Sequence, residues 1–501
     1  MMIDMLGHWN PGRGTLMEVR ATEESAASAA AAPPHPAPAS FLQENHLRGT
    51  RAAADRGDRH AAYLTATTEV DGDFDGDALV RAVQRFTTRH DGLRCWFDVS
   101  DGMVTRHLVD AVDVGFRIER VGEVDDYGYL TGAGEANRFR DHVTARFANE
   151  ASALRWPGFA AGVVVRPHGF TLFLGCDHAL SDGVSQAMAL AEVADLYYSE
   201  RDGTDVGPFT SAPTGSALAY AVAERERAAR FTPESPEVQA WCSAAAATGG
   251  GMPRFPLDLG LPDGQSAPVR PVKFDVLDAA GAAEFERICR ARGARMIGGI
   301  TAVLAMVDRE LAGATDYFTI TALADRTLAD VTLTQGWFCR FAPVAFGIDT
   351  AHTFTELVGT AAAACERGAA CSEVPVPTVI GALLAAGAPP ERVLVTPQLL
   401  SYIDFRRFPM AGTPAYDRGM QSTGEGRTAN ASLWFNRDDR SLYLGTQIPD
   451  TPRAAAVLGA HHRRIREIFA DIVATGDHVI ASATDDDPTP ATRSSLARHH
   501  D

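Results

Sequence analysis

One short stretch of the chain gathers side chains that can do acid–base chemistry. Residues 173–185 read FLGCDHALSDGVS, so an acid, a histidine, a second acid and a glycine follow an apolar run. A neutral imidazole can accept a hydroxyl proton near pH 7, because the unperturbed pKa of histidine lies close to that pH. His178 is therefore a candidate general base, and Asp182 and Gly183 would hold the loop that aims it. We expect Gly183 to allow a backbone conformation or a close approach that a side chain would forbid.

The two-residue period of a strand separates the neighbours of His178. If residues 170–178 form a strand, Cys176 and His178 share one face and Asp177 points to the other. Asp177 and His178 are then poor partners for each other. Asp182 lies at the following turn, where its carboxylate can accept from backbone amides or meet an arginine from elsewhere in the chain.

Three other interpretations of this stretch compete with the general base. A metal site would need Asp177, His178 and Asp182 on one ion, but the strand splits the first two and no second His/Cys cluster lies near, so we expect no metal. A Cys–His nucleophile would need an exposed, electropositive thiol, whereas Cys176 lies in an apolar strand. The third is a polar turn in which Ser181 or Asp182 caps the next helix, which does not exclude catalysis.

The elements around this stretch place it on a loop between a strand and a helix. Two apolar runs within 159–178 flank Pro167, His168 and Gly169, which predicts a hairpin. The sequence from 184 to 200 has helical periodicity. Catalytic groups are common on loops that rigid elements hold in place.

Size and composition limit the classes of partner. At 501 residues with 46% hydrophobic residues, the chain predicts a packed protein of two domains. A net charge of -18 argues against nucleic acid and anionic lipid as partners. The seven cysteines show no CxxC spacing, and no apolar run is long enough to span a membrane. Because the first residues also lack a secretory signal, we expect a cytoplasmic protein.

A Gly/Pro/Ser/Thr-rich break at 202–216 is the best domain boundary. We therefore expect an N-terminal lobe over 1–205 that carries the motif, a C-terminal lobe over 206–485 and a polar tail over 486–501. The Ala/Pro-rich residues 20–40 predict an extended or poorly ordered connector. The adjacent His461 and His462 are expected on a solvated face of the last helix.

The stretch from Asp177 to Gly183, DHALSDG, resembles the His-His-x-x-x-Asp-Gly motif of the condensation-domain superfamily of acyltransferases. That superfamily includes chloramphenicol acetyltransferase, carnitine acyltransferases, plant acyl-CoA transferases and the condensation domains of nonribosomal peptide synthetases. His178 matches the second, catalytic histidine. Asp177 replaces the first histidine, whose part in the family is mainly structural, so the departure leaves the base in place.

Other segments, in order along nearly the whole chain, are similar to one branch of that superfamily, the polyketide-associated acyltransferases of mycobacteria, which acylate trehalose and related lipids. These segments are HWNPGRG, SFLQ, RHDGLRCWF, SPEVQAW, FPLDLG, MIGGITAVLA and LTQGWFCRFAPV. The resemblance implies an α/β (α+β) fold of two chloramphenicol-acetyltransferase-like lobes, which form a V around a central tunnel. His178 would lie near the middle of this tunnel.

The resemblance also implies partners for the motif. In the family the acid matching Asp182 is structural and pairs with an arginine of the second lobe, and the segment ALADRTLAD makes Arg326 the candidate. Further candidates to line the tunnel, weaker than the motif, come from two segments: Gln335, Trp337, Trp434 and Asn436. The Asp-Phe-Gly-Trp-Gly loop of many relatives is absent from this sequence.

The activity implied by the resemblance is O-acyl transfer, with His178 as general base. The donor would be acyl-CoA or a phosphopantetheine-linked acyl chain, with no permanently bound cofactor. The acceptor would be a hydroxyl of a trehalose-like sugar or of a polyketide or lipid alcohol, and an acyl-carrier protein or polyketide synthase domain is a candidate partner. The alternatives are a stand-alone condensation enzyme that forms an amide with an amine, and a catalytically silent scaffold of the same fold.

Overall fold

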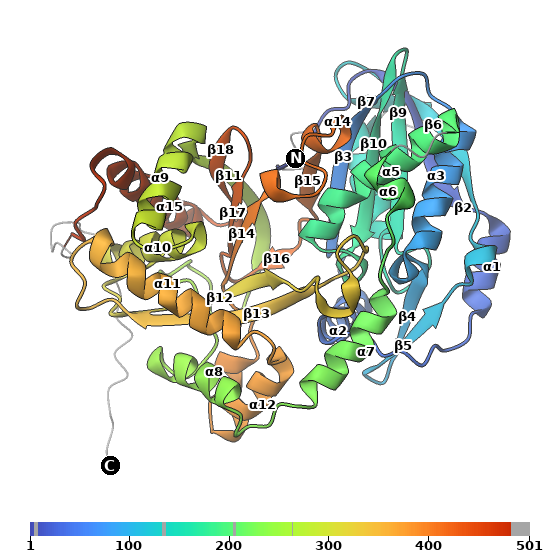
Figure 1. Cartoon of the computed structure of the whole chain (residues 1–501). Helices are drawn as coiled ribbons and strands as arrows, with labels where there is room; N and C mark the ends of the chain where they lie inside the picture. Colours follow the sequence, from blue (N-terminus) through green and yellow to red (C-terminus); the bar gives the residue numbers. More distant parts are fainter. Residues whose placement is uncertain (5–8, 133–136, 204–206, 263, 482–501) are drawn as a thin grey trace.

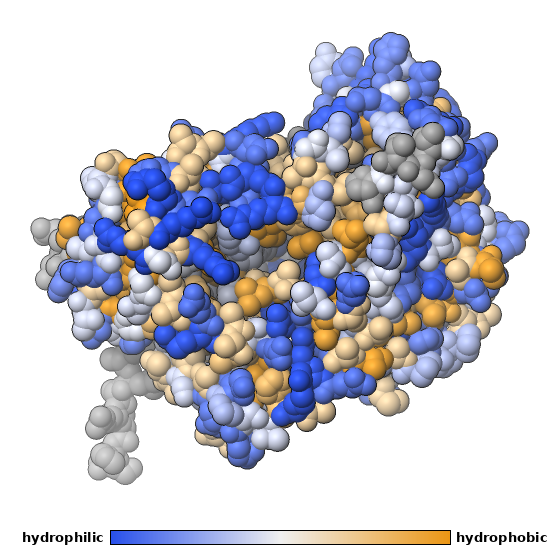
Figure 2. Space-filling model, viewed as in Figure 1, coloured by the Kyte–Doolittle hydropathy of each residue, from blue (hydrophilic) through white to orange (hydrophobic). Residues whose placement is uncertain are grey.

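Two β-sheets, each covered by helices, make up the protein. The computed structural model describes residues 1–4, 9–132, 137–203, 207–262 and 264–481. Figure 1 shows one sheet in the N-terminal half of the molecule and the other beside it in the C-terminal half. The predicted mixed α/β architecture is confirmed. Figure 2 shows the viewed surface indented where the two halves meet, with apolar side chains beside the indentation.

The N-terminal sheet carries the candidate motif on one of its central strands. Its order is β1 (Met2–Ile3), β15 (Met420–Thr423), β3 (Tyr63–Asp71), β10 (Gly169–Asp177), β9 (Phe159–Arg166), β2 (Gly14–Ala21), β6 (Phe116–Val124), β7 (Tyr129–Thr131) and β8 (Asn137–Arg138). The predicted hairpin is present, since β9 and β10 pair antiparallel. A separate hairpin joins β4 (Cys95–Ser100) to β5 (Met103–Leu108).

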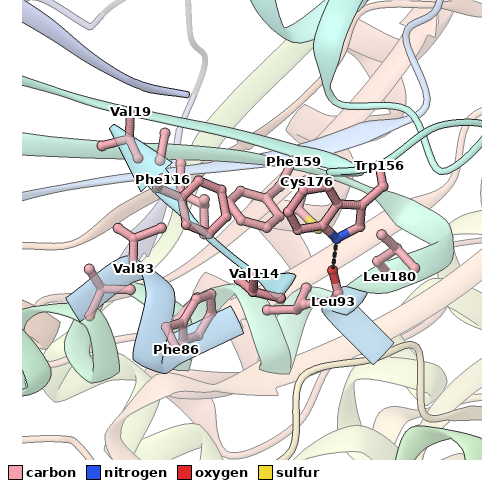
Figure 3. Close-up of a cluster of buried hydrophobic side chains, with 14 of the residues drawn as sticks. Val19, Val83, Phe86, Leu93, Val114, Phe116, Trp156, Phe159, Cys176 and Leu180 are labelled. Atoms are coloured by element: carbon pink, nitrogen blue, oxygen red, sulfur yellow. Dashed lines mark hydrogen bonds between the residues drawn. The ribbon is translucent and has the colours of Figure 1, made fainter. Parts of the chain in front are cut away.

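Helices α3 (Gly76–Arg89) and α5 (Gly183–Asp202) cover one face of this sheet, and α4 (Phe139–Glu150) covers the other. Leu172, Leu174 and Cys176 of β10 lie in the core under α3 and α5, whereas Phe173 lies in the core under α4. The predicted alternation of faces is therefore confirmed. Figure 3 shows Cys176 inside the first core, beside Trp156.

The C-terminal sheet is built in the same way. Its order is β13 (Cys339–Gly347), β12 (Asp316–Ala324), β14 (Leu399–Asp404), β17 (Leu433–Arg437), β18 (Ser441–Pro449), β11 (Ala267–Asp278) and β16 (Arg427–Thr428). One face packs against α9 (Ala279–Ala291), α10 (Met296–Ala312), α11 (Phe354–Ala370) and α15 (Pro452–Thr475). The other packs against α8 (Pro236–Ala247) and α12 (Val376–Ala385). The remaining described α-helices are α1 (Glu23–Ala31), α2 (Phe41–Asp55), α6 (Pro208–Ser211), α7 (Ala217–Ala228), α13 (Pro390–Val393) and α14 (Pro414–Asp417).

Two local predictions are wrong. Residues 20–40 are not an extended connector throughout, because α1 occupies 23–31: its alanines favour a helix, and the Thr22 hydroxyl caps it by accepting from the backbone N–H of Ser25. His461 and His462 are not solvated. They are 1% and 7% exposed, because α15 turns them towards Phe255 and Phe274.

The C-terminal half of the chain contributes one strand to the N-terminal sheet. β15, at residues 420–423, pairs antiparallel with β3 in the N-terminal sheet, although its neighbours in sequence belong to the C-terminal sheet. The division at 205/206 stays a prediction, as does the central tunnel. The expected tail at 486–501 lies outside the described residues.

Candidate functional site

The motif occupies a tight connection between β10 and α5. β10 ends at Asp177, a single 3₁₀ turn spans His178–Leu180, and α5 begins after Asp182. Asp182 caps the helix, since its Oδ1 accepts from the backbone N–H of Ser185 at 2.6 Å. The backbone N–H of His178 donates to the carbonyl of Ala62 at 3.0 Å. The loop of His178 is therefore held by hydrogen bonds to the backbone at both of its ends.

The imidazole of His178 is partly exposed and packs against an aromatic ring. Its ring centroid lies 4.0 Å from that of Trp337, with the planes 34° apart. Its Nδ1 is buried and makes no hydrogen bond to another described residue. Burial lowers the pKa of His178, and the nearby His46 lowers it further. The ring is thus neutral at pH 7, which is the form a general base requires.

Asp177, which replaces the family's first histidine, is fully buried and points away from His178. Its Oδ1 accepts from Nε2 of His46 at 2.8 Å and from the N–H of Ala179 at 2.7 Å. Its Oδ2 accepts from the N–H of Ala153 at 2.8 Å and lies 3.4 Å from Nε2 of His60. Burial alone raises the pKa of Asp177, but these contacts outweigh it and hold the pKa below its usual range.

Asp182 joins the motif to the second half of the chain. Its Oδ1 lies 2.7 Å from Nη2 of Arg326, and its Oδ2 accepts from the N–H of Phe338 at 3.0 Å. The Asp182 and Arg326 side chains are only 10% and 11% exposed. Arg326 also donates to the hydroxyl of Ser185 at 2.8 Å and to the carbonyl of Thr334 at 2.9 Å. The pair inferred from the resemblance therefore lies at the contact between the two halves.

Gly183 does not need to be glycine for the reason the sequence suggested. Its φ lies outside the left-handed region, and a Cβ at this position would meet only Cδ1 of Ile403, at an ordinary 3.6 Å. The expectation that it permits a forbidden conformation or close approach is wrong. The loop turns instead through the 3₁₀ turn at His178–Leu180, which other residues also adopt.

The four weaker tunnel candidates separate into different environments. Trp337 contacts His178, but Gln335 is 2% exposed and its backbone N–H donates to Nδ1 of His90 at 3.2 Å. Trp434 and Asn436 share the face of β17 that points away from the core under α10. Among the ring contacts of the described residues, His178 meets Trp337 but not Trp434.

Asn436 is fully buried and has one free acceptor. Its Nδ2 donates to the carbonyl of Trp434 at 2.8 Å, while its Oδ1 is buried and makes no hydrogen bond to a described residue. Asn436 is in register with Ile403, the residue beside Gly183. This face of the C-terminal sheet is therefore turned towards the loop that carries the motif.

Sequence reasoning missed the histidines that hold Asp177. His46 lies on α2 and His60 lies just before β3, both more than 100 residues before Asp177. No spacing connects either residue with the motif. The available signal was indirect: a buried carboxylate needs hydrogen-bond partners, but the sequence does not show which segment supplies them.

The competing interpretations of the motif fit the geometry less well. Cys176 is 2% exposed, and burial raises the pKa of its thiol well above the usual value, so it is not an activated nucleophile. Across the described ranges no group of three His, Cys, Asp or Glu side chains is arranged to hold a metal ion. The helix cap at Asp182 exists, and it leaves the imidazole of His178 partly exposed.

Comparison with known proteins identifies the group to which this fold belongs. The family described as "Condensation domain" matches residues 38–399. The chain belongs to the condensation-domain family. The match covers more than half of the chain and includes the motif, Arg326 and most strands of the N-terminal sheet.

Similar proteins in the family are acyltransferases. The chain is 30% identical to 2'-acyl-2-O-sulfo-trehalose (hydroxy)phthioceranyltransferase PapA1 of Mycobacterium tuberculosis over 473 residues, 93% of this chain and 88% of PapA1. It is 26% identical to acyltransferase PapA3 of the same species over 493 residues, 95% of this chain and 98% of PapA3. Among solved structures it resembles PapA2 acyl transferase, with a TM-score of 0.83 and 22% identity over 94% of this chain and all of that one.

These findings establish the enzyme class. The condensation-domain protein is an acyltransferase, and its sequence resembles the polyketide-associated branch over nearly its full length. The fold of two sheet-centred halves is the one found in PapA2. Within the described ranges, no helix combines the length and the apolar character that crossing a membrane requires.

Proposed function

We propose that this condensation-domain protein transfers an acyl group from a thioester to a hydroxyl of a trehalose-like sugar, with His178 as the general base. One observation supports the proposal: a partly exposed, neutral imidazole lies on a loop that Asp182 and Arg326 fix at the contact between the two halves. A base so placed is available to substrates that enter between the halves. The chemistry needs no resident cofactor.

The proposed reaction has two steps. The acceptor hydroxyl donates a hydrogen bond to Nε2 of His178, which takes the proton as the oxygen attacks the thioester carbonyl. A carbon–oxygen bond forms and the carbonyl becomes a tetrahedral oxyanion. When this intermediate collapses, the carbon–sulfur bond breaks, the thiolate leaves, and His178 returns its proton to the sulfur. No acyl-enzyme forms, so no serine or cysteine nucleophile is required.

The relatives support a sugar acceptor. The name of PapA1 describes a transferase that acts on an acylated, sulfated trehalose. For the present chain we propose trehalose or a substituted trehalose, with a polyketide or lipid alcohol as the alternative acceptor. The donor is acyl-CoA or an acyl chain on the phosphopantetheine arm of a carrier protein. These donors and the seven free cysteines support a cytoplasmic site of action.

The test is a mass-spectrometric acyl-transfer assay with purified protein. Short, branched and long acyl-CoAs are offered with trehalose, trehalose sulfate and a panel of other sugars, alcohols and amines. Wild type should form an ester, and His178→Ala should lower the rate by about 10²–10⁴-fold. The matched control is His168→Ala, because His168 is exposed at the opposite end of the same hairpin and should leave the rate unchanged.

Three results would redirect the proposal. An amide product with the amines would favour the condensation reaction. If product formed only with an acylated carrier protein, the carrier protein and not CoA would be the donor. Equal rates for wild type and His178→Ala would remove His178 as the base, and failure with every donor and acceptor would favour a silent scaffold.

A further inference from the structure

The base lacks the carboxylate that commonly orients a catalytic imidazole. Nδ1 of His178 is buried and bonds to no other described residue, whereas catalytic histidines are often aimed by a carboxylate at that atom. The ring is restrained instead by a hydrogen bond to its own backbone and by the ring contact with Trp337, at 4.0 Å between centroids. The position of Trp337 therefore helps to set the direction in which His178 presents Nε2.

Trp337 is itself held by a second histidine. The ring of His46 meets Trp337 edge to face, with centroids 5.7 Å apart and planes at 88°, and its centroid is 6.2 Å from that of His178. The His46 side chain is only 10% exposed. The three rings form one cluster: His46 comes from α2, His178 from the 3₁₀ turn after β10, and Trp337 from the segment before β13.

The orientation of His46 is fixed by Asp177. The 2.8 Å contact between Nε2 of His46 and Oδ1 of Asp177 links α2 to the residue directly before the base. Asp177 in turn cannot move freely, because the backbone amides of Ala153 and Ala179 donate to it. The replacement of the family's first histidine by an acid thus coincides with a histidine supplied by α2.

We propose that His46 is a positioning residue for acyl transfer: Asp177 holds it, and its ring fixes Trp337 and thereby the imidazole of His178. The kinetic part of this inference rests on the proposed function. His46 acts through the other rings and is not required to touch either substrate. Trp337 is the element that transmits its position.

The charges around His178 give a second readout of the same geometry. His46 on α2, Asp177 at the end of β10 and Asp182 at the start of α5 are the charged or titratable groups that influence it most, and Trp337 faces it without charge. Burial lowers the pKa of His178 and His46 lowers it further, while Asp182 and Asp177 raise it. His46→Gln should therefore raise the pKa of His178, and Asp177→Asn should lower it.

The kinetic test compares two histidines in equivalent pairs. His46→Gln retains an N–H donor for Asp177 but removes the ring, and it should lower kcat by about 10–100-fold with KM within about threefold, because misaimed groups lose rate rather than binding. The control is His142→Gln: Nε2 of His142 also lies 2.8 Å from a buried carboxylate, that of Glu18, yet it is on α4. That control should keep kcat unchanged.

A double-mutant cycle tests transmission through Trp337. If His46 acts only through that ring, the kcat of Trp337→Leu should equal that of the double variant Trp337→Leu/His46→Gln. The fold-losses in kcat of the two single variants should then not multiply in the double variant. Trp337→Leu also serves alone if His46→Gln does not fold, as judged by circular dichroism. Independent, multiplying losses would overturn the proposal, as would a His46→Gln loss confined to KM or a kcat equal to that of His142→Gln.

An NMR titration separates this inference from the proposed function. In protein labelled at histidine Cε1, the signal of His178 is assigned by its absence in His178→Gln. His46→Gln should raise the pKa read from that signal, and His142→Gln should not. If no acyl transfer is found with any substrate, the proposed function fails while this shift still supports the ring cluster. An unshifted signal would overturn the positioning inference even in an active enzyme.

Discussion

Removing the charge of Arg326 is expected to destabilise the protein severely. The Asp182–Arg326 pair is about nine-tenths buried at both side chains and spans 2.7 Å. Breaking such a pair by removing one partner typically costs about 3–5 kcal/mol, because it strands a buried charge. In Arg326→Met, Asp182 keeps the backbone N–H groups of Ser185 and Phe338, which places the expected loss of unfolding free energy near the lower end, about 3 kcal/mol.

The assay is urea unfolding followed by tryptophan fluorescence, with Arg418→Met as the matched control. Arg418 also forms an ion pair with an aspartate, Asp71, but these side chains are 37% and 71% exposed. An exposed pair contributes only about 0–1 kcal/mol. Acyl transfer by Arg326→Met should also fall, since the loop that carries His178 loses its tie to the second half. Equal unfolding free energies for the two variants would refute the reasoning from burial.

Three further outcomes follow from the site and the cores. Burial lowers the pKa of His178, and the base must be neutral to accept a proton. In a pH–rate profile, kcat/KM should therefore stay constant from pH 8 to pH 7 and decline only below pH 6.5, the ordinary pKa of histidine. A decline that begins above pH 7 would contradict this. Burial lowers the pKa of His462 to about 3, so the unfolded chain binds a proton at higher pH than the folded one, and stability should be lost as pH falls from about 6.5 towards 3. Between pH 7 and 5, wild type should lose about 2 kcal/mol more unfolding free energy than His462→Phe in urea titrations, and parallel curves would exclude a neutral buried His462. Gly183→Ala should change the unfolding free energy by less than about 0.5 kcal/mol, whereas Gly175→Ala should lower it by about 1–3 kcal/mol, because the added Cβ would overlap the ring of Phe147. Thermal unfolding of the two variants tests this difference. Equal melting temperatures would show that the core under α4 can rearrange to accept the Cβ.

The elements around the motif could be predicted from the sequence because they follow from local rules. Alternation along residues 170–177 gave the correct faces of β10, and the turn residues at 167–169 predicted the hairpin. A cap by Ser181 or Asp182 was predicted from the same local rules, and Asp182 is the residue that forms it. The Asp182–Arg326 pair needed the family resemblance, since 144 residues separate the partners and no periodicity connects them.

Long-range contacts set the limit of that reasoning. His46 and His60 were not connected with Asp177, because the sequence reveals only that a buried acid needs partners and not which helix supplies them. Gly183 was over-interpreted, since the sequence cannot show that the turn forms at residues 178–180 instead. The burial of His461 and His462 depends on the packing of α15 on β11, which helical periodicity alone does not orient.

The passage of β15 into the N-terminal sheet bears on how this chain can be divided. β15 lies between β1 and β3, so a fragment that ends near residue 205 would expose the edge of β3, whose residues are largely buried in the whole protein (Figure 1). An uncovered apolar edge of this kind is a template for strand pairing between molecules. Expressed as separate halves, the chain should therefore aggregate, unless the N-terminal piece receives residues 420–423 from a co-expressed partner fragment.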